Sequence, residues 1–119
     1  MDVKKIQATI KHLQEGGLAI VMDDADREAE GDLVGLASEA TPEKVNFMTK
    51  YARGLMCVPM APEVAERLKL PQMTADNSDP FGTAFTISVD HHSTTTGISA
   101  FDRWRTITHL AAPTAKNED

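Results

Sequence analysis

Apolar residues recur every three or four positions in several segments, which is the spacing of one face of a helix. The first segment predicts a helix over residues 3–15, and a glycine pair ends it. Thr41, followed by proline and glutamate, combines an N-cap with a first-turn proline and predicts a second helix. Residues 62–68 predict a third short helix. Ser99 and Asp102 resemble a capping box and predict a fourth helix, which stops before the next proline.

Short apolar or alternating runs lie between these helices and predict β-strands. The runs are LAIVM at residues 18–22, LVGLA at 33–37, LMCVP at 55–59 and TAFTISV at 83–89. The last run alternates most regularly and is rich in β-formers. Since predicted helices and strands alternate along the chain, the pattern favours an α/β (α+β layered) fold with a mixed β-sheet flanked by helices.

Size and composition fit one folded domain over residues 1–119. The chain has a mass of 13.0 kDa, with 41% hydrophobic and 25% charged residues, and shows neither an internal repeat nor a linker. No stretch approaches the ~20 apolar residues of a membrane span. The first residues lack the pattern of a secretory signal, and Cys57 is the only cysteine, which together favour a cytoplasmic protein. A net charge of −6 argues against broad nucleic-acid binding.

The sequence DDADREAEGD at residues 23–32 is the most unusual stretch of the chain. Acidic side chains occupy every second position from Asp24 to Asp32, so an extended loop would place five carboxylates on one side. Neighbouring carboxylates repel one another, and oxygen ligands without a thiolate suit a hard cation such as Mg²⁺ or Mn²⁺. Arg27 stands within the run, where its guanidinium could bind a substrate oxyanion.

Two other interpretations compete with a catalytic metal site. The run resembles the first half of an EF-hand calcium loop, but Ala37 stands where that loop requires a bidentate glutamate, and the flanks look like strands. A solvated acidic turn without any ligand is the simpler interpretation of a charge run taken alone.

A second polar stretch, STTTGISAFDR, covers residues 93–103. Threonine hydroxyls, a glycine and the start of the helix at Ser99 offer neutral donors and a favourable dipole for a phosphate group, although turn and capping chemistry explains the same residues. Cys57 lies in an apolar strand candidate, where it could be a reactive thiol, although a lone cysteine in such a strand usually packs in the core.

Four blocks in this order are similar to the 3,4-dihydroxy-2-butanone 4-phosphate synthase family of riboflavin biosynthesis. They are DDADREAEGDL, ATPEKVNFMTKYARGLMCVPM, NSDPFGTAFTISVD and TTTGISAFDRWRTI, and the resemblance covers essentially the whole chain. It implies a divalent-metal lyase that converts D-ribulose 5-phosphate into L-3,4-dihydroxy-2-butanone 4-phosphate and formate. It also implies a homodimer with sites at the subunit interface, and the cofactor would be Mg²⁺ or Mn²⁺.

The resemblance also implies roles for residues at matching positions. Arg27 and Glu28 correspond to a pair that contacts the substrate, and Glu28 is also expected to bind the metal. Glu30 is expected to act as acid or base, and Asp32 to hold a substrate hydroxyl while taking part in catalysis. Cys57 matches an active-site cysteine of the family.

Thr95 and Thr96 match the family's TTG turn beside the substrate.

Two departures qualify the resemblance. Ala29 stands where the family usually has Asp or Asn, which removes one polar group beside the site. The family also ordinarily continues beyond the position of Asp119, with further histidines, an arginine and a glutamate, so we expect a chain that lacks the C-terminal portion of the domain. We therefore expect little activity from these 119 residues alone. An inactive fragment and a non-catalytic module that binds a cation or a protein remain the alternatives, and fusion to a GTP cyclohydrolase II-like domain stays open.

Overall fold

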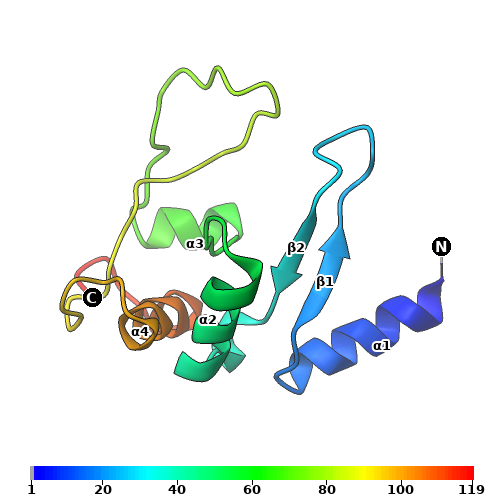
Figure 1. Ribbon diagram of the computed structural model, residues 1–119. Helices are drawn as coiled ribbons and strands as arrows, with labels where there is room; N and C mark the ends of the chain where they lie inside the picture. The colour runs from blue at the N-terminus through cyan, green and yellow to red at the C-terminus, as the bar shows by residue number, and fades with distance from the viewer. Residues whose placement is uncertain (1) are drawn as a thin grey trace.

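The protein is described here by a computed structural model, which covers residues 2–119. The elements in chain order are α1 (Val3–Gln14), β1 (Ala19–Met22), β2 (Gly31–Val34), the 3₁₀ helix η1 (Ala37–Glu39), α2 (Pro42–Phe47), the π-helix η2 (Met48–Ala52), α3 (Pro62–Arg67) and α4 (Ala100–Ala111). Figure 1 shows the β1–β2 hairpin between α1 and a group of helices, with a long segment looping out between α3 and α4.

All four predicted α-helices are present, and three begin with a predicted or evident cap. The carboxylate of Asp2 accepts a hydrogen bond from the Lys5 amide at the start of α1. The hydroxyl groups of Thr41 and Ser99 do the same at α2 and α4. These bonds satisfy amide groups that the first turn of a helix leaves without a backbone partner.

The hairpin is antiparallel, and its register pairs Ile20 with Leu33 and Met22 with Gly31. We predicted the second strand at residues 33–37, but it starts two residues earlier and ends at Val34. The ladder reaches toward the acidic loop because the Asp23 amide donates to the Glu30 carbonyl at 2.8 Å. The strand therefore includes Gly31 and Asp32, which the apolar pattern alone did not indicate.

Two predicted strands, at residues 55–59 and 83–89, are wrong as strands. Both segments are irregular, and only Thr86 forms an isolated antiparallel bridge, with Gln72. A strand requires a neighbouring backbone to accept and donate its ladder bonds, and within residues 2–119 these segments have no such neighbour beyond that one bridge. The predicted mixed sheet is therefore a two-stranded antiparallel sheet in the described chain.

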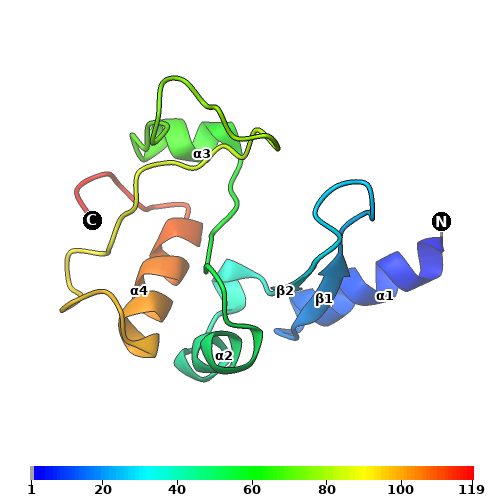
Figure 2. The same ribbon diagram turned by 45° about the horizontal axis from the view of Figure 1, so that its top comes forward.

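The best-buried apolar side chains come from three separate places: Val45 on α2, Leu68 after α3, and Ala115 near the C-terminal end. Helix α2 packs against α4, which in turn contacts η1. Figure 2 shows α2 and α4 side by side with η1 close to them. The predicted class, helices combined with a β-sheet, is confirmed. No helix within residues 2–119 is long and apolar enough to cross a membrane.

Candidate active site

The acidic run connects β1 to β2 as a compact turn. The Arg27 amide donates to the Asp24 carbonyl at 3.0 Å, and the Ala29 amide donates to the same oxygen at 3.3 Å. Ala29 has φ of 56°, in the left-handed region that costs most residues energy and that Asn and Asp adopt more readily. The Asp or Asn that the resemblance implies for this position would therefore suit the backbone better than alanine does.

The extended loop with five carboxylates on one side, as predicted from the alternation, is wrong. The turn forms because the Asp23 carboxylate captures two donors of its own loop, the Glu28 amide at 3.0 Å and the Arg27 guanidinium at 2.9 Å. Such short-range bonds offer the backbone an alternative to extended structure. The bond from the Glu28 amide is also the main reason that the pKa of the Asp23 carboxyl lies below its usual value. Sequence reasoning missed this role of Asp23.

Arg27 is held between carboxylates and an aromatic ring. Its guanidinium contacts Asp23 at 2.9 Å and Glu28 at 3.4 Å, and it lies 5.7 Å from the centre of the Phe81 ring, within the range of a cation–π contact. The hydrogen bond to Asp23 raises the pKa of the Arg27 guanidinium, so this cation stays charged. The side chain is fixed at the loop surface in a position to meet an anionic ligand.

Phe81 belongs to a second loop that is tied together by its own polar groups. The Asp79 carboxylate accepts from the Thr83 amide at 2.7 Å, and the Gly82 amide donates to the Asp79 carbonyl at 3.0 Å. The bond from Thr83 lowers the pKa of the Asp79 carboxyl. Gly82 has φ of 66°, which glycine adopts without strain. The contact with Arg27 thus joins two ordered loops that are far apart in sequence.

The threonine-rich turn before α4 is organised by Asp102. One oxygen of this buried carboxylate accepts from the Thr95 amide at 3.1 Å, the Thr95 hydroxyl at 2.8 Å and the Gly97 amide at 3.2 Å. The bond from the Thr95 hydroxyl is the main cause that lowers the pKa of the Asp102 carboxyl. The Ser99 cap predicted from the sequence is confirmed, but Asp102 reaches back to the turn, so the reciprocal half of the predicted box is wrong.

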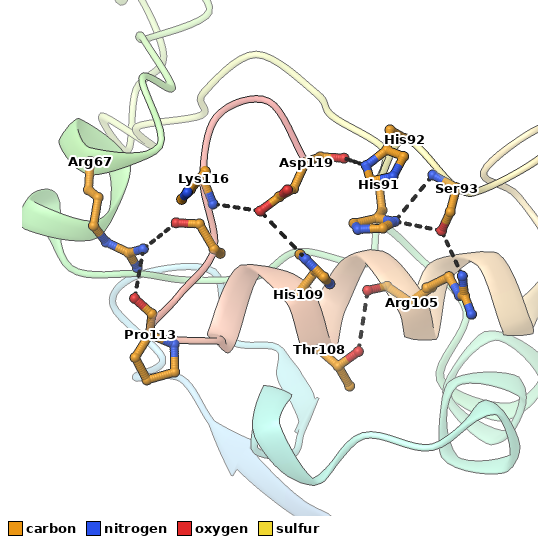
Figure 3. A network of polar contacts seen from close by, with 11 residues as sticks. Arg67, His91, His92, Ser93, Arg105, Thr108, His109, Pro113, Lys116 and Asp119 are labelled. Carbon is orange, nitrogen blue, oxygen red and sulfur yellow. Dashed lines mark hydrogen bonds and ion pairs between the residues drawn. The ribbon is translucent and has the colours of Figure 1, made fainter.

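Figure 3 shows a histidine cluster beside helix α4, formed by His91, His92 and His109. The His91 ring stacks on His109 with centroids 3.9 Å apart, and its Nδ1 accepts from the Ser93 amide at 3.2 Å. Arg105 donates to the Ser93 hydroxyl at 2.7 Å. Burial, together with the nearby His109, lowers the pKa of His91. Because Nδ1 is an acceptor here, the network requires the neutral form of His91.

The predicted site residues fall into separate groups. Arg27, Glu28, Glu30 and Asp32 share the hairpin, and all four are exposed. Cys57 is a free, exposed thiol in the irregular segment between η2 and α3, so its predicted strand and core setting are wrong.

Both ribbon views place the hairpin loop and the segment leading into α4 on opposite sides of the molecule. One copy of the described chain therefore does not join the acidic loop to Thr95 and Thr96. Across residues 2–119, no three His, Cys, Asp or Glu side chains converge as a metal site. The carboxylates of the hairpin are chemically suited to a hard cation, but as they lie here they do not form a complete ligand set.

The architecture defines an α/β protein that combines helices and a two-stranded antiparallel sheet with an acidic hairpin loop and a threonine turn at the start of a helix. The sequence model described as 3,4-dihydroxy-2-butanone 4-phosphate synthase matches residues 7–119. The chain belongs to this family.

Similar proteins share the whole of this chain but are longer than it. A 3,4-dihydroxy-2-butanone 4-phosphate synthase of Oceanobacillus iheyensis is 56% identical over 118 residues, which cover 99% of this chain and 57% of that protein. The riboflavin biosynthesis protein RibBA of Aquifex aeolicus is 50% identical over 117 residues, covering 96% of this chain and 29% of its own length. The chain thus spans little more than half, or less, of these relatives.

A solved structure of a 3,4-dihydroxy-2-butanone 4-phosphate synthase in complex with two magnesium ions has the same fold. It superposes with a TM-score of 0.90 at 46% sequence identity, over 94% of this chain and 53% of that one. The Candida albicans enzyme superposes with a TM-score of 0.84 at 45% identity, over 96% of this chain and 56% of that one. The arrangement of helices and hairpin is therefore that of the matched part of these enzymes.

Proposed function

We propose that this chain supplies the acidic-loop part of a site that converts D-ribulose 5-phosphate into L-3,4-dihydroxy-2-butanone 4-phosphate and formate, a lyase step of riboflavin biosynthesis. The observation that carries the proposal is the family match over residues 7–119, which includes the complete acidic loop. The fixed position of Arg27 at the surface of this loop supports it, because a held guanidinium binds an oxyanion with less loss of side-chain entropy.

The hairpin offers three kinds of group for the reaction. In this proposal, Arg27 contacts the sugar phosphate through its guanidinium N–H groups. Glu28 contacts substrate hydroxyls through its carboxylate. Glu30 accepts and returns protons at carbon, and Asp32 holds a hydroxyl and takes part in proton transfer. Asp23 acts through Arg27, since it fixes the guanidinium, which also contacts Glu28. Cys57 is proposed beside the reacting centre.

A divalent cation, Mg²⁺ or Mn²⁺, is proposed as the cofactor, with Glu28 as one of its ligands. The magnesium complex of a related synthase supports the choice of a hard cation. When bound, such a cation would polarise substrate oxygens, and the proton transfers are proposed for the protein's own side chains. We place the protein in the cytoplasm and propose that residues 1–119 belong to a single 3,4-dihydroxy-2-butanone 4-phosphate synthase-like domain.

We further propose a homodimer in which the site uses two copies. The segment that leads into α4 lies away from the hairpin loop of its own copy in both views, so we propose that the loop of a partner copy meets Thr95 and Thr96. In that arrangement the threonine turn, held in shape by Asp102, faces the phosphate end of the substrate.

A chimera tests the proposed activity. The matched 118 residues of the Oceanobacillus iheyensis enzyme are replaced by those of this chain, and formate release from ribulose 5-phosphate is measured with Mg²⁺. We expect turnover within about tenfold of the parent, and a loss of about 10²-fold or more for Glu30→Gln or Arg27→Ala. Asp24→Asn, a neutralised acid of the same loop, is the matched control and should change the rate less than about threefold.

The 119-residue chain alone is assayed in parallel and is expected to release little formate. A chimera that folds and dimerises but releases no formate would contradict the proposed function.

A further inference from the structure

Phe81 is a large aromatic residue that is not part of the core, because it is 52% exposed. It nevertheless lies in a loop whose backbone is held on both sides. The Asp79 amide donates to the side-chain oxygen of Asn77 at 2.9 Å, and the Asn77 side chain donates to the Thr83 carbonyl at 2.9 Å. These bonds add to those that the Thr83 and Gly82 amides donate to Asp79. The loop therefore presents an aromatic ring to its surroundings in a defined place.

The exposed ring meets Arg27 of the acidic loop. The central carbon of the guanidinium lies over the ring, 5.7 Å from its centre, which is within the ~6 Å of a cation–π contact. Figure 1 shows the segment between α3 and α4 reaching toward the loop that joins β1 to β2. The pKa of the Asp79 carboxyl is lowered mainly by the bond from Thr83 and further by the charge of Arg27. Two groups of the Phe81 loop thus attract the same guanidinium.

The ring and the carboxylates act on different parts of the planar guanidinium. Asp23 contacts Nη1 at 2.9 Å and Glu28 contacts Nη2 at 3.4 Å, so both carboxylates act at its edge. The Phe81 ring acts on a face, which edge contacts leave open. The two carboxylate contacts use at most two of the five N–H groups of an arginine, so other N–H groups point to a ligand. The ring therefore contributes to the orientation in which those N–H groups are held.

We propose that Phe81 is a positioning residue, whose ring holds the Arg27 guanidinium in the orientation that receives an oxyanion of the substrate. The inference rests on the proposed function for the identity of the ligand, D-ribulose 5-phosphate. Phe81 supplies no group to the chemistry and acts through Arg27. Because it supports a contact made with substrate and transition state alike, loss of the ring should raise KM and leave kcat nearly unchanged.

The expected effect is small but measurable. Arg27 is half exposed, and a cation–π contact at an exposed site changes an equilibrium constant by a factor of about two to five. Phe81→Leu keeps an apolar side chain but removes the π-face, so KM and the dissociation constant Kd should rise about two- to fivefold. Phe81→Tyr and Phe81→Trp keep an aromatic face and should leave both constants within about 1.5-fold of the parent.

The test uses the chimera with the Oceanobacillus iheyensis enzyme. Formate release gives KM and kcat. Calorimetry with ribulose 5-phosphate and Mg²⁺ gives Kd in the Glu30→Gln form, which binds substrate without turning it over in the proposed function. Phe81→Leu is then combined with Arg27→Met, which has no cation left to position. In that background Phe81→Leu should change Kd by less than about 1.3-fold, since two residues that act as a pair are not additive.

The matched control is Phe101→Leu on α4. Phe101 is 51% exposed, and its ring centre lies 5.4 Å from the central carbon of the Arg105 guanidinium, so the substitution removes a contact of the same kind elsewhere. It should leave Kd and KM within about 1.3-fold of the parent. Circular dichroism checks that the variants keep the helix content of the chimera.

Two results would overturn the proposal. One is an unchanged Kd and KM in Phe81→Leu. The other is an equal rise of Kd with and without Arg27, since the ring would then act on the substrate or on the fold rather than on the guanidinium. An active chimera with either result would leave the proposed function standing and reject only the role of Phe81. A chimera that releases no formate, but whose Kd depends on Phe81 only when Arg27 is present, would reject the proposed reaction and keep the positioning role.

Discussion

Val45 provides the sharpest test of how the helices are held together. It lies on α2, the helix that packs against α4, and it is the most deeply buried large side chain of the described chain, at 1% exposure. We predict that Val45→Ala destabilises the protein by about 2 to 3 kcal/mol. Two lost methyl groups account for about 1.6 kcal/mol at ~0.8 kcal/mol each, and the cavity that remains adds to this loss.

This loss would be a large part of the total stability, which is about 5 to 15 kcal/mol for a typical domain. The assay is urea unfolding followed by circular dichroism, with the slope of the transition compared between variants. Asn46→Ala is the matched control, because Asn46 is the exposed neighbour on the same helix, and it should change the free energy of unfolding by less than about 0.5 kcal/mol. A loss below about 0.5 kcal/mol for Val45→Ala, with an unchanged slope, would refute the view that the contact of α2 with α4 is the core.

Two further predictions concern the threonine turn and the histidine cluster. Asp102→Asn keeps the shape of the side chain but removes the charge that strengthens three hydrogen bonds. Hydrogen exchange at the Thr95 and Gly97 amides should therefore speed up at least about fivefold, while the control Asp76→Asn should leave the exchange rate unchanged. Equal protection of these amides in both variants would contradict this role of Asp102. His91 faces His92, His109, Arg105 and Asp119, and its pKa lies below the usual 6.5. The folded protein therefore favours the neutral form of His91. Its contribution to stability is complete above about pH 6.5 and is lost as the pH falls through the lowered pKa. Urea midpoints should therefore fall between about pH 7.5 and 5 in the parent and fall less in His91→Gln; parallel curves would show that His91 does not carry the effect.

The helices could be predicted from the sequence because their signals are local. Spacing and caps predicted both ends of α1 and α4 to within about a residue or two, and the first-turn proline predicted the start of α2. The strands at residues 55–59 and 83–89 failed because strand formation depends on a partner backbone elsewhere in the molecule, and an apolar pattern cannot reveal whether that partner is present.

The shape of the acidic loop was predicted wrongly, and the catalytic and binding roles of its residues stay predictions. The alternating acids suggested an extended loop, whereas Asp23 bonds within the loop and closes a turn. The contact of Arg27 with Phe81 also could not be anticipated, because the two residues are far apart in sequence and meet only in the folded chain. The role of Asp102 had a local signal, its position three residues after Ser99, but the signal indicated a capping box rather than support for the turn.

The central claim is a site that combines the acidic loop of one copy with the threonine turn of another. Mixing two inactive chimeras tests it most directly, one with Glu30→Gln and one with Thr96→Val, with formate release as the readout. Random exchange of subunits makes half of the dimers mixed, and each mixed dimer has one intact site of two, so the account predicts about a quarter of the parent activity. No recovery of activity, although mixed dimers are demonstrated by mass, would contradict the account.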